Sequence, residues 1–444
     1  MSSDACRLSE IANIQGGFAF KSADFQNEGI AVVKIANIQP PAVSLVSVDR
    51  VAPEKLARLE RFKLEDGDIL MAMTGATVGK VGRFKESELA YLNQRVARIS
   101  ALKGKQFDDF IYAVVSLPGF DELIEGASSG SAQANISAAG IGSVQIPKLT
   151  ETEQLEIGEI ARAVDDRITL LRETNETLEA IAQALFKSWF VDFDPVRAKA
   201  EGKLPEGIDE ATAELFPDAF EETELGLVPK GWGVVSLNEY CKILKGCSYK
   251  GAGLSDNAGA YMLNLGCFNA PRVFAFENIK RYTGEYKERH RVSAGDLIVA
   301  NTDMTQVRAI LGRPLIVPDG LQDSFISHHV FRLQLLNSDE PSMRNFLFFT
   351  LQQSEFRKRA IGYATGTTVL ALPKEVLEGF KLTRPSNEVL AAFNEVTNPL
   401  LDSIQENEIK VNALSNLRDT LLPRLISGQL RIADAETELE KATA

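Results

Sequence analysis

A glycine-rich stretch, TGATVGKV at residues 74–81, is similar to a loop that binds the phosphates of a nucleotide. Such a loop has four residues between its two glycines, and a hydroxyl side chain after the lysine that holds magnesium. Here three residues separate Gly75 from Gly79, and Val81 stands where the hydroxyl is needed. We therefore do not expect the stretch to bind a nucleotide.

Other stretches also lack parts that catalysis needs. FDPVR at residues 193–197 resembles the DPPY site of an amino-methyltransferase, but it lacks the second proline and the aromatic ring that stacks a flipped base. The three histidines, His290, His328 and His329, have no metal-ligand spacing, and a strand would point the adjacent pair to opposite faces. We expect no catalytic, metal-binding or cofactor-binding residue, although a nuclease carboxylate cluster stays open.

Polar side chains at loop tips suit a different chemistry, which is contact with DNA. Lys and Arg neutralise phosphates, whereas Asn and Gln can pair with adenine edges and Arg with guanine edges in the major groove. Residues of these types, with Ser, Thr and His, stand in loops that differ between the two halves of the chain. The candidates are Lys21, Lys80, Asn93, Gln94, Arg95 and Ser131 in the first half, and Lys250, Asn301, Gln306, Arg308, His328 and Thr367 in the second.

These loops belong to a framework that occurs twice in the chain. GDILMAMTGATVGKVGRF at 67–84 and GDLIVANTDMTQVRAILGR at 295–313 begin alike and then differ. The equivalent pairs include Gly17 with Gly246, Val96 with Val330, Arg98 with Arg332 and Gly130 with Gly366. Their separation drifts from 229 to 236 residues, as small loop insertions would produce. The sequence therefore indicates a tandem duplication, in which one scaffold carries two different tips.

Each copy has a body that mixes strands and helices. Short β-branched or aromatic runs bounded by turn residues predict strands at 31–38, 68–73, 97–102 and 144–149. Runs at 107–117 and 343–361 predict helices between them. We expect two tandem α+β domains, each followed by a long helix.

The two long helices are expected to pack against each other. Thr150 and Glu153 have the spacing of a capping box, and apolar residues then recur by sevens. Each helix has one Asn in the middle of its stripe, Asn175 or Asn407. The pair meets if the helices run antiparallel; alternatively, both point to solvent. The residues expected in the coiled coil or in subunit docking are Leu171, Asn175, Leu178, Leu185, Trp189, Phe190, Ile404, Asn407, Leu414, Leu421 and Leu425.

The net charge of −13 for 444 residues argues against a nucleic-acid partner only when it is taken over the whole chain. Residues 1–150 carry 16 Lys and Arg against 17 Asp and Glu, and residues 232–386 carry 19 against 14. The bodies are therefore neutral to basic. Length favours at least two domains, and no apolar run suits a membrane span or a signal peptide, so we expect a cytoplasmic protein with no membrane partner.

Three stretches carry a resemblance to a known family. They are ALFKSWFVDFDPVRAK at 184–199, KLPEGIDEATAELFPDAFEETELGLVPKGW at 203–232 and LRDTLLPRLISGQLRI at 417–432. Together they resemble the conserved regions of the specificity subunit of type I restriction–modification systems. The resemblance implies an α+β fold, in which two conserved helices form an antiparallel coiled coil with pseudo-two-fold symmetry. It divides the chain into target recognition domain 1 (1–150), a central helical spacer (151–200), an acidic linker (201–231), target recognition domain 2 (232–386), a C-terminal helical spacer (387–432) and an acidic tail (433–444).

The same resemblance implies a non-catalytic subunit that reads an asymmetric bipartite DNA site for DNA methylation and host defence. Two methyltransferase (modification) subunits would dock on the conserved helices, and restriction subunits would complete the complex. S-adenosylmethionine, ATP and magnesium are then expected on partner subunits. Trp189, Phe190 and Phe193 suggest apolar surface that awaits a subunit. Two alternatives stay open: a stand-alone DNA methyltransferase or nuclease, and a duplicated protein-binding scaffold.

Overall fold

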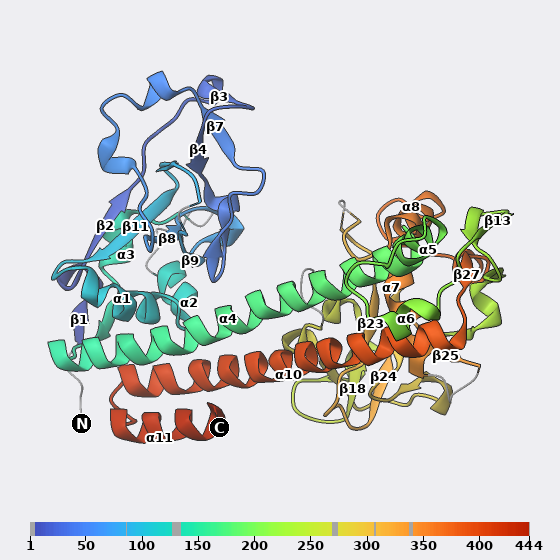
Figure 1. Ribbon diagram of the computed structural model, residues 1–444. Helices are drawn as coiled ribbons and strands as arrows, with labels where there is room; N and C mark the ends of the chain where they lie inside the picture. Colours follow the sequence, from blue (N-terminus) through green and yellow to red (C-terminus); the bar gives the residue numbers. More distant parts are fainter. Residues whose placement is uncertain are drawn as a thin grey trace. The chain divides into compact units, whose positions relative to one another are not determined.

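The computed structural model describes residues 5–85, 87–126, 135–268, 274–305, 308–336 and 341–443. The chain divides into two compact units. Unit 1 comprises Met1–Thr169 and Ala413–Ala444, and unit 2 comprises Leu170–Asn412. Two long helices, α4 (Glu151–Phe190) and α10 (Asn387–Ile426), contribute to both units and are labelled in Figure 1.

Unit 1 contains two main sheets, with the strand orders β2-β11-β8-β9-β6-β5 and β10-β4-β7-β3, and a short pair β1-β12. Its strands are β1 (Ala5–Arg7), β2 (Ala12–Gly16), β3 (Phe25–Gln26), β4 (Ile30–Val33), β5 (Ile38–Gln39), β6 (Ala42–Val43), β7 (Asp49–Val51), β8 (Ile69–Ala72), β9 (Val81–Arg83), β10 (Ala90–Leu92), β11 (Val96–Ala101) and β12 (Gln145–Pro147). Its shorter helices are α1 (Asp108–Val115), α2 (Phe120–Gly126), α3 (Ala138–Gly142) and α11 (Ile432–Thr443).

Unit 2 repeats this plan with the orders β16-β25-β21-β23 and β17-β19-β18-β24-β20, beside the pairs β13-β14, β15-β27 and β22-β26. Its strands are β13 (Phe220–Thr223), β14 (Gly226–Pro229), β15 (Gly233–Ser236), β16 (Cys241–Lys245), β17 (Leu254–Ser255), β18 (Ala260–Leu263), β19 (Lys280–Tyr282), β20 (Arg291–Val292), β21 (Leu297–Ala300), β22 (Thr302–Asp303), β23 (Pro314–Ile316), β24 (Ser324–Ile326), β25 (Val330–Leu335), β26 (Leu370–Ala371) and β27 (Lys381–Arg384). Its shorter helices are α5 (Asp194–Ala200), α6 (Glu210–Glu214), α7 (Pro341–Gln352), α8 (Ser354–Gly362) and α9 (Lys374–Glu378).

The central strand of each unit explains why its sequence is apolar at every position. Successive side chains of a strand point to opposite faces, so a strand between two cores buries all of them. In β8, Ile69 and Met71 pack into the core that contains α1, whereas Leu70 and Ala72 pack into the core of the smaller sheet. β21 divides its residues between two cores in the same way.

Most predicted elements are present, although several are shorter than expected. The run at 31–38 forms β4 and then a 3-10 turn, and the run at 68–73 forms β8. The run at 343–361 was expected to be one helix, but it forms α7 and α8, which are separated by Gln353 in an extended conformation. The α+β class with two long helices packed together is confirmed. Pseudo-two-fold symmetry and the domain boundaries stay predictions.

Helix α4 begins with the predicted capping box. The Thr150 backbone N–H donates to the Glu153 carboxylate over 2.8 Å, and the Glu153 N–H donates to the Thr150 hydroxyl over 3.3 Å. Both N–H groups lie at the helix start, where no backbone carbonyl is available to accept them. The cap therefore fixes where the body of unit 1 ends and the long helix begins.

Helices α4 and α10 run antiparallel, and the two asparagines meet as predicted. The Asn407 amide donates to Asn175 Oδ1 over 2.8 Å, and the Asn175 amide donates to the Ile404 carbonyl over 3.1 Å. Asn175 is 5% exposed, so the alternative in which it points to solvent is excluded. Polar pairs inside an apolar stripe select one register, because any shift leaves them without partners.

An Asn175→Leu variant is expected to lose about 2 kcal/mol of unfolding free energy in unit 2, because the Asn407 amide would lose its buried acceptor. Trp189 and Trp232, the two tryptophans of the chain, both lie in the core of unit 2, so their fluorescence during urea unfolding reports on it. Thr177→Leu, at an exposed position of the same helix, should change the free energy by less than about 0.5 kcal/mol. A loss for Asn175→Leu that matches this control would contradict the pairing.

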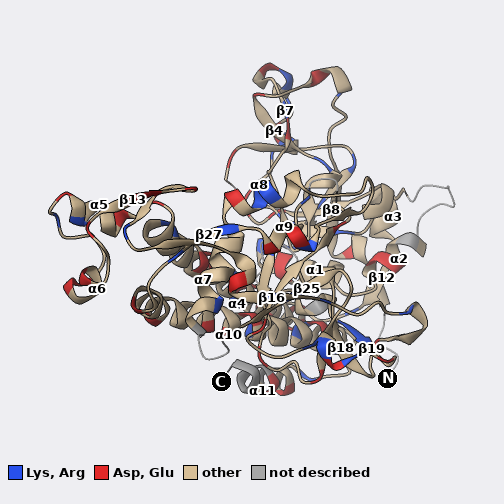
Figure 2. Ribbon diagram, turned by 90° about the vertical axis from the view of Figure 1, so that its right-hand side faces the viewer, with Lys and Arg blue, Asp and Glu red and all other residues tan. Residues whose placement is uncertain are grey.

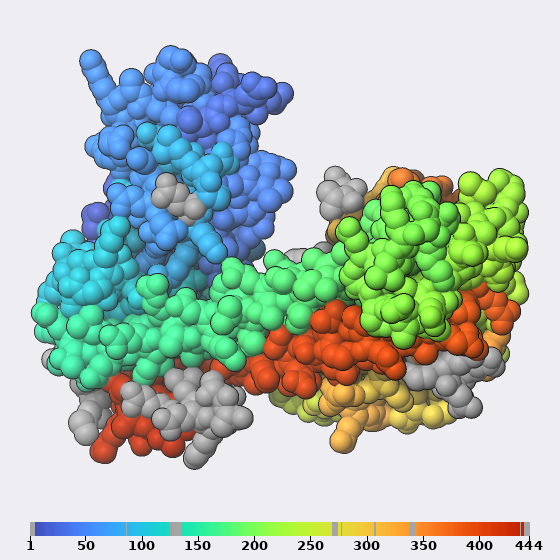
Figure 3. Space-filling model, in the orientation of Figure 1, coloured from blue at the N-terminus to red at the C-terminus, as the bar shows by residue number. Residues whose placement is uncertain are grey.

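The aromatic end of α4 differs from the sequence expectation. Trp189, Phe190 and Phe193 are 2%, 5% and 8% exposed, so the prediction that they form apolar surface awaiting a subunit is wrong. Phe216 lies 5.0 Å from Trp189 and Trp232 lies 5.9 Å from Phe190, measured between ring centroids. The light-green segment of Figure 3, which follows α4, supplies both covering residues and lies over the helix ends in unit 2.

Candidate nucleic-acid interface

The two units contain the same four-stranded frame. The order β2-β11-β8-β9 in unit 1 corresponds to β16-β25-β21-β23 in unit 2, with antiparallel pairing throughout. Arg98 of β11 pairs with Leu70, and its equivalent Arg332 of β25 pairs with Ile298. The registers therefore agree with the sequence repeat residue by residue.

A half-buried arginine holds each frame together. Arg98 donates to the Asp68 carboxylate over 3.2 Å and to the Lys63 carbonyl over 2.9 Å. Arg332 donates to the Asp296 carboxylate over 3.0 Å and to the Arg291 carbonyl over 2.8 Å. Both aspartates come from the repeated Gly-Asp that precedes the central strand, so the repeated residues build the scaffold and not the variable tip.

In each unit, the equivalent turn connects a strand of the second main sheet to a strand of the frame. In unit 1, Asn93, Gln94 and Arg95 connect β10 to β11; in unit 2, Ser327, His328 and His329 connect β24 to β25. The backbone bonds correspond: Gln94 N–H donates to Phe18 and His328 N–H to Cys247, over 2.9 and 2.8 Å. We call these segments turn 1 (Asn93–Arg95) and turn 2 (Ser327–His329).

The backbone of a glycine packs closely against each turn. A Cβ atom added to Gly17 would lie 2.2 Å from the Asn93 carbonyl oxygen, and one added to Gly246 would lie 2.2 Å from the Ser327 carbonyl oxygen. No side chain fits at such distances, so the backbone itself packs against the turn. This close approach accounts for the pairing of Gly17 with Gly246 in the sequence repeat.

A Gly17→Ala variant is expected to displace turn 1 and to lower affinity for DNA at least tenfold, because backbone atoms must move to admit the methyl group. Gly16→Ala is a matched control, since a Cβ at Gly16 meets no atom within 4 Å. Titration of labelled duplex with each purified variant measures the difference. Equal affinity of the two variants would contradict a role for turn 1 in DNA binding.

A further loop is hydrogen-bonded to the residue that follows each central strand. Ile136 N–H donates to the Met73 carbonyl over 3.0 Å in unit 1, and Leu372 N–H donates to the Asn301 carbonyl over 2.7 Å in unit 2. These loops lead to the positions of Ser131 and Thr367. Ser131, like Gln306, lies outside the described residues, whereas Thr367 is exposed.

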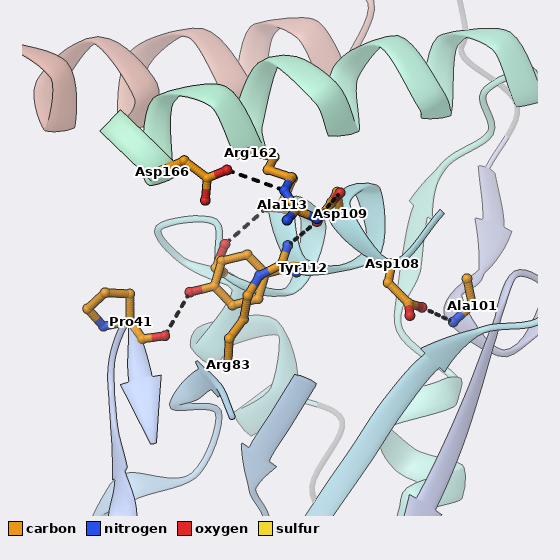
Figure 4. Close-up of polar contacts among 10 residues, drawn as sticks. Pro41, Arg83, Ala101, Asp108, Asp109, Tyr112, Ala113, Arg162 and Asp166 are labelled. Carbon is orange, nitrogen blue, oxygen red and sulfur yellow. Dashed lines mark hydrogen bonds and ion pairs between the residues drawn. The ribbon is translucent and has the colours of Figure 1, made fainter. Parts of the chain in front are cut away.

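The body of unit 1 is fixed to α4 by ion pairs on one aspartate (Figure 4). Asp109 of α1 lies 2.7 Å from Arg83 Nη2 and 3.3 Å from Arg162 Nη1. The Arg83 guanidinium also stacks 4.3 Å from the Tyr112 ring centroid, and burial raises the pKa of Tyr112 to about 12. Since Arg83 belongs to β9 and Arg162 to α4, the frame that carries turn 1 is held on the long helix.

Two residues that were predicted to contact DNA are buried in the structure. Asn93 is 6% exposed and Asn301 is 3% exposed, which contradicts direct contact of these side chains with DNA. The Asn301 amide donates to the His328 carbonyl over 3.1 Å, and Asn93 Oδ1 accepts from Arg95 N–H over 3.4 Å. Both residues therefore position the turns.

The other candidates in the described part of the chain lie at the surface. Exposed residues are Lys21, Lys80, Gln94, Arg95, Lys250, Arg308 and Thr367, and His328 is half-buried. Lys80 lies in the loop between the antiparallel strands β8 and β9, where no helix follows as it would in a phosphate-binding loop. Their role in binding DNA stays a prediction.

The pair His328 and His329 also differs from the sequence expectation. A strand would point these side chains to opposite faces, but turn 2 places their ring centroids 3.8 Å apart. Burial lowers the pKa of both imidazoles, and Lys245 lowers each further, as does the neighbouring His328 for His329. The sequence reasoning did not name His329 as a candidate. The repeat separation that makes Arg98 equivalent to Arg332 nevertheless makes Arg95 equivalent to His329.

Basic residues of unit 2 occur on β19 and, in a separate place, on α8, and Figure 2 shows both in blue. Some are used within the unit: Arg281 donates to the Tyr261 hydroxyl over 2.6 Å, and Arg359 to the Val376 carbonyl over 3.2 Å. Lys280 and Lys358 are exposed. These two lysines are further candidates for phosphate contact, which the sequence reasoning missed because no repeat position marks them.

Among the described residues, His, Cys, Asp and Glu nowhere come together in groups of three or more that could hold a metal ion. Within the same ranges, no helix combines the length and the apolar character needed to cross a membrane. FDPVR begins helix α5, and its Pro195 and Val196 are buried in that helix.

The chain has relatives among known proteins. Residues 3–180 match the family model described as type I restriction modification DNA specificity domain. The type I restriction enzyme HindI specificity subunit of Haemophilus influenzae is 26% identical over 357 residues, covering 70% of this chain and 74% of that protein. The MjaIX specificity subunit of Methanocaldococcus jannaschii is 23% identical over 339 residues, covering 73% and 70%.

A solved structure shares the fold. The crystal structure of the S subunit of the type I restriction–modification system from M. genitalium aligns over 95% of this chain and 96% of that chain, with a TM-score of 0.56 and 13% identity. This match shows a shared fold, and the sequence matches show that the chain is similar to the specificity subunits of type I restriction–modification systems.

Proposed function

We propose that this chain recognises an asymmetric, bipartite DNA sequence for a type I restriction–modification complex, with one half-site read by each unit. The observation that carries the proposal is the pair of matched frames with unlike turns. Gln94 and Arg95 in turn 1 correspond to His328 and His329 in turn 2, on frames whose registers agree. A scaffold that is the same in both units but carries different donors and acceptors suits two different base sequences.

The long helices would set the distance between the half-sites. A 40-residue helix such as α4 is about 60 Å long at 1.5 Å per residue, and the Asn175–Asn407 pair fixes its register against α10. Two readers held on a stiff coiled coil select half-sites at one spacing. The gap in the DNA site is then a property of the helices and not of the turns.

The outer face of α4 is the proposed docking surface for a modification subunit. Leu170 and Ile181 are 52% and 50% exposed, and their eleven-residue separation places them on one face of the helix. Exposed apolar residues of this size suit a protein interface. Two modification subunits and the restriction subunits would supply catalysis, with S-adenosylmethionine, ATP and magnesium bound there, while this chain itself is not catalytic.

A footprint of the chain with its modification subunits tests the proposal. Two protected patches separated by an unprotected gap are expected, and the logarithm of the affinity should fall linearly with the logarithm of the salt concentration, because Lys and Arg displace counterions from phosphates. A single continuous patch, or affinity that does not depend on salt, would contradict it.

The alternatives predict different results in simple assays. A stand-alone methyltransferase would transfer a labelled methyl group from S-adenosylmethionine to DNA when the purified chain is alone, and we expect no transfer. A duplicated protein-binding scaffold would give no DNA binding even with modification subunits present. Neither alternative accounts for basic and hydrogen-bonding residues at two equivalent turns.

A further inference from the structure

We infer that His328 and His329 determine the specificity of unit 2 by donating, as an imidazolium, to an acceptor on DNA. The half-site of unit 2 is therefore bound more tightly at lower pH. Unit 1 reads its half-site through Gln94 and Arg95, and its binding does not depend on pH. The inference rests on the proposed function and extends it. The acceptor is a purine N7 or O6 atom in the major groove.

The first support is the chemistry of the equivalent positions. Arg95 carries a fixed positive charge with several donors, and Gln94 offers one amide donor group and one acceptor. A neutral imidazole has one donor and one acceptor, whereas a protonated one has two donors and a charge. Turn 2 therefore matches the donor pattern of Arg95 only after it takes up a proton.

The second support is the geometry around turn 2. The two imidazole centroids lie 3.8 Å apart, the Tyr249 ring centroid lies 5.7 Å from His328, and His329 Nδ1 lies 2.8 Å from the Thr302 hydroxyl. His328 Nδ1 is buried and has no hydrogen-bond partner. A buried polar atom without a partner is unfavourable by roughly 1–3 kcal/mol, so a ligand or a shift of the turn that satisfies it is favoured.

The third support is the charge that faces the pair. Lys245 at the end of β16 lowers the pKa of both imidazoles, in addition to their burial. The Tyr249 ring lies beside the His328 ring, and the Cys247 carbonyl accepts from the His328 backbone N–H. On β22, the Asp303 carboxylate is occupied by the N–H groups of Thr305, Ile310 and Leu311. These contributions lower the pKa of both imidazoles, although the Cys247 backbone raises that of His328, and DNA would supply the missing negative charge.

The sign of the pH dependence follows from these facts. A DNA acceptor beside the pair raises the imidazole pKa in the complex above its value in the free chain, which lies below the usual 6.5. Affinity then rises as the pH falls through the pKa of the complex, and it levels off below the pKa of the free chain. Uptake of one proton gives at most about a tenfold rise in affinity per pH unit.

The experiment uses the full-length chain assembled with modification subunits, at constant ionic strength from pH 8.5 to 5.5. Binding is measured on three duplexes: the complete site, the site with the unit 1 half scrambled, and the site with the unit 2 half scrambled. We expect the rise in affinity on the complete site and on the duplex that keeps the unit 2 half. Loss of the rise when the unit 2 half is scrambled supports a base acceptor, and its persistence there contradicts the inference, because a phosphate contact does not depend on the base sequence.

Variants of the two turns test whether the pH dependence of DNA binding arises from His328 and His329. H328Q/H329R gives turn 2 the residues of turn 1, and should remove the pH dependence and change the bases preferred in the unit 2 half alone. Q94H/R95H should introduce pH dependence in the unit 1 half. His290→Gln, which removes the third histidine of the chain, should keep the wild-type dependence.

The outcomes also separate this inference from the proposed function. A bipartite footprint with affinity that is flat between pH 8.5 and 5.5, or a pH dependence that survives H328Q/H329R, overturns the inference and leaves the proposed function standing. Failure of wild-type chain to protect two patches overturns both.

Discussion

A Trp189→Ala variant is expected to lose about 4 kcal/mol of unfolding free energy in unit 2, because a large aromatic side chain is removed from a closed core. Trp189 is 2% exposed and contacts Phe216 at 5.0 Å, edge to face, and Phe393 at 5.9 Å. Aromatic pairs of this kind add to the stabilisation that area burial provides. Urea unfolding followed through Trp232 fluorescence measures the loss.

The control for this variant is Ile181→Ala on the same helix. Ile181 is 50% exposed, so its truncation should change the unfolding free energy by less than about 1 kcal/mol. If Trp189 instead formed free apolar surface for a subunit, the two variants would unfold at similar urea concentrations. That result would contradict the closed core of unit 2.

The duplicated scaffold could be predicted because its residues are constrained locally. Strands buried on both faces are apolar at successive positions, the Gly-Asp before each central strand is fixed by the arginine that binds it, and Gly17 and Gly246 have no room for a side chain. The heptad spacing likewise predicted that Asn175 meets Asn407, since one polar residue in an apolar stripe has few partners.

The tips could not be predicted in the same way, because residue type does not show which way a side chain points. Asn301 has the donors of a base reader, yet the turn uses its amide to hold the His328 carbonyl. His328 and His329 were assigned to a strand, whereas a turn brings both rings together. Trp189 fits the heptad, but only long-range folding shows that Phe216 covers it.

Lengthening both long helices by one heptad is expected to lengthen the gap in the preferred DNA site and to lower affinity for the original site about 100-fold or more, since only one half could be engaged. The insertions belong between Thr169 and Leu170 and between Asn412 and Ala413. These points correspond in the register that pairs Asn175 with Asn407. Seven residues add two turns of a coiled coil, so the stripe continues without a break.

The size of the change follows from two competing requirements. Seven helical residues add roughly 10 Å, which corresponds to about three base pairs at 3.4 Å each. Three base pairs also rotate the groove by roughly a third of a turn, and twisting the duplex to compensate is unfavourable. We therefore expect the new gap to exceed the old one by one to three base pairs, as read from the methylated motif of the assembled complex.

Added length outside the helices provides the control. Seven residues inserted at Gly202, an exposed position between α5 and α6, enlarge the chain equally without extending α4 or α10. That variant should methylate the original motif with its original gap, because the turns and both long helices are unchanged. If the heptad variant also kept the original gap, the spacing of the half-sites would not come from the coiled coil, and the readers would have to be placed by some other contact.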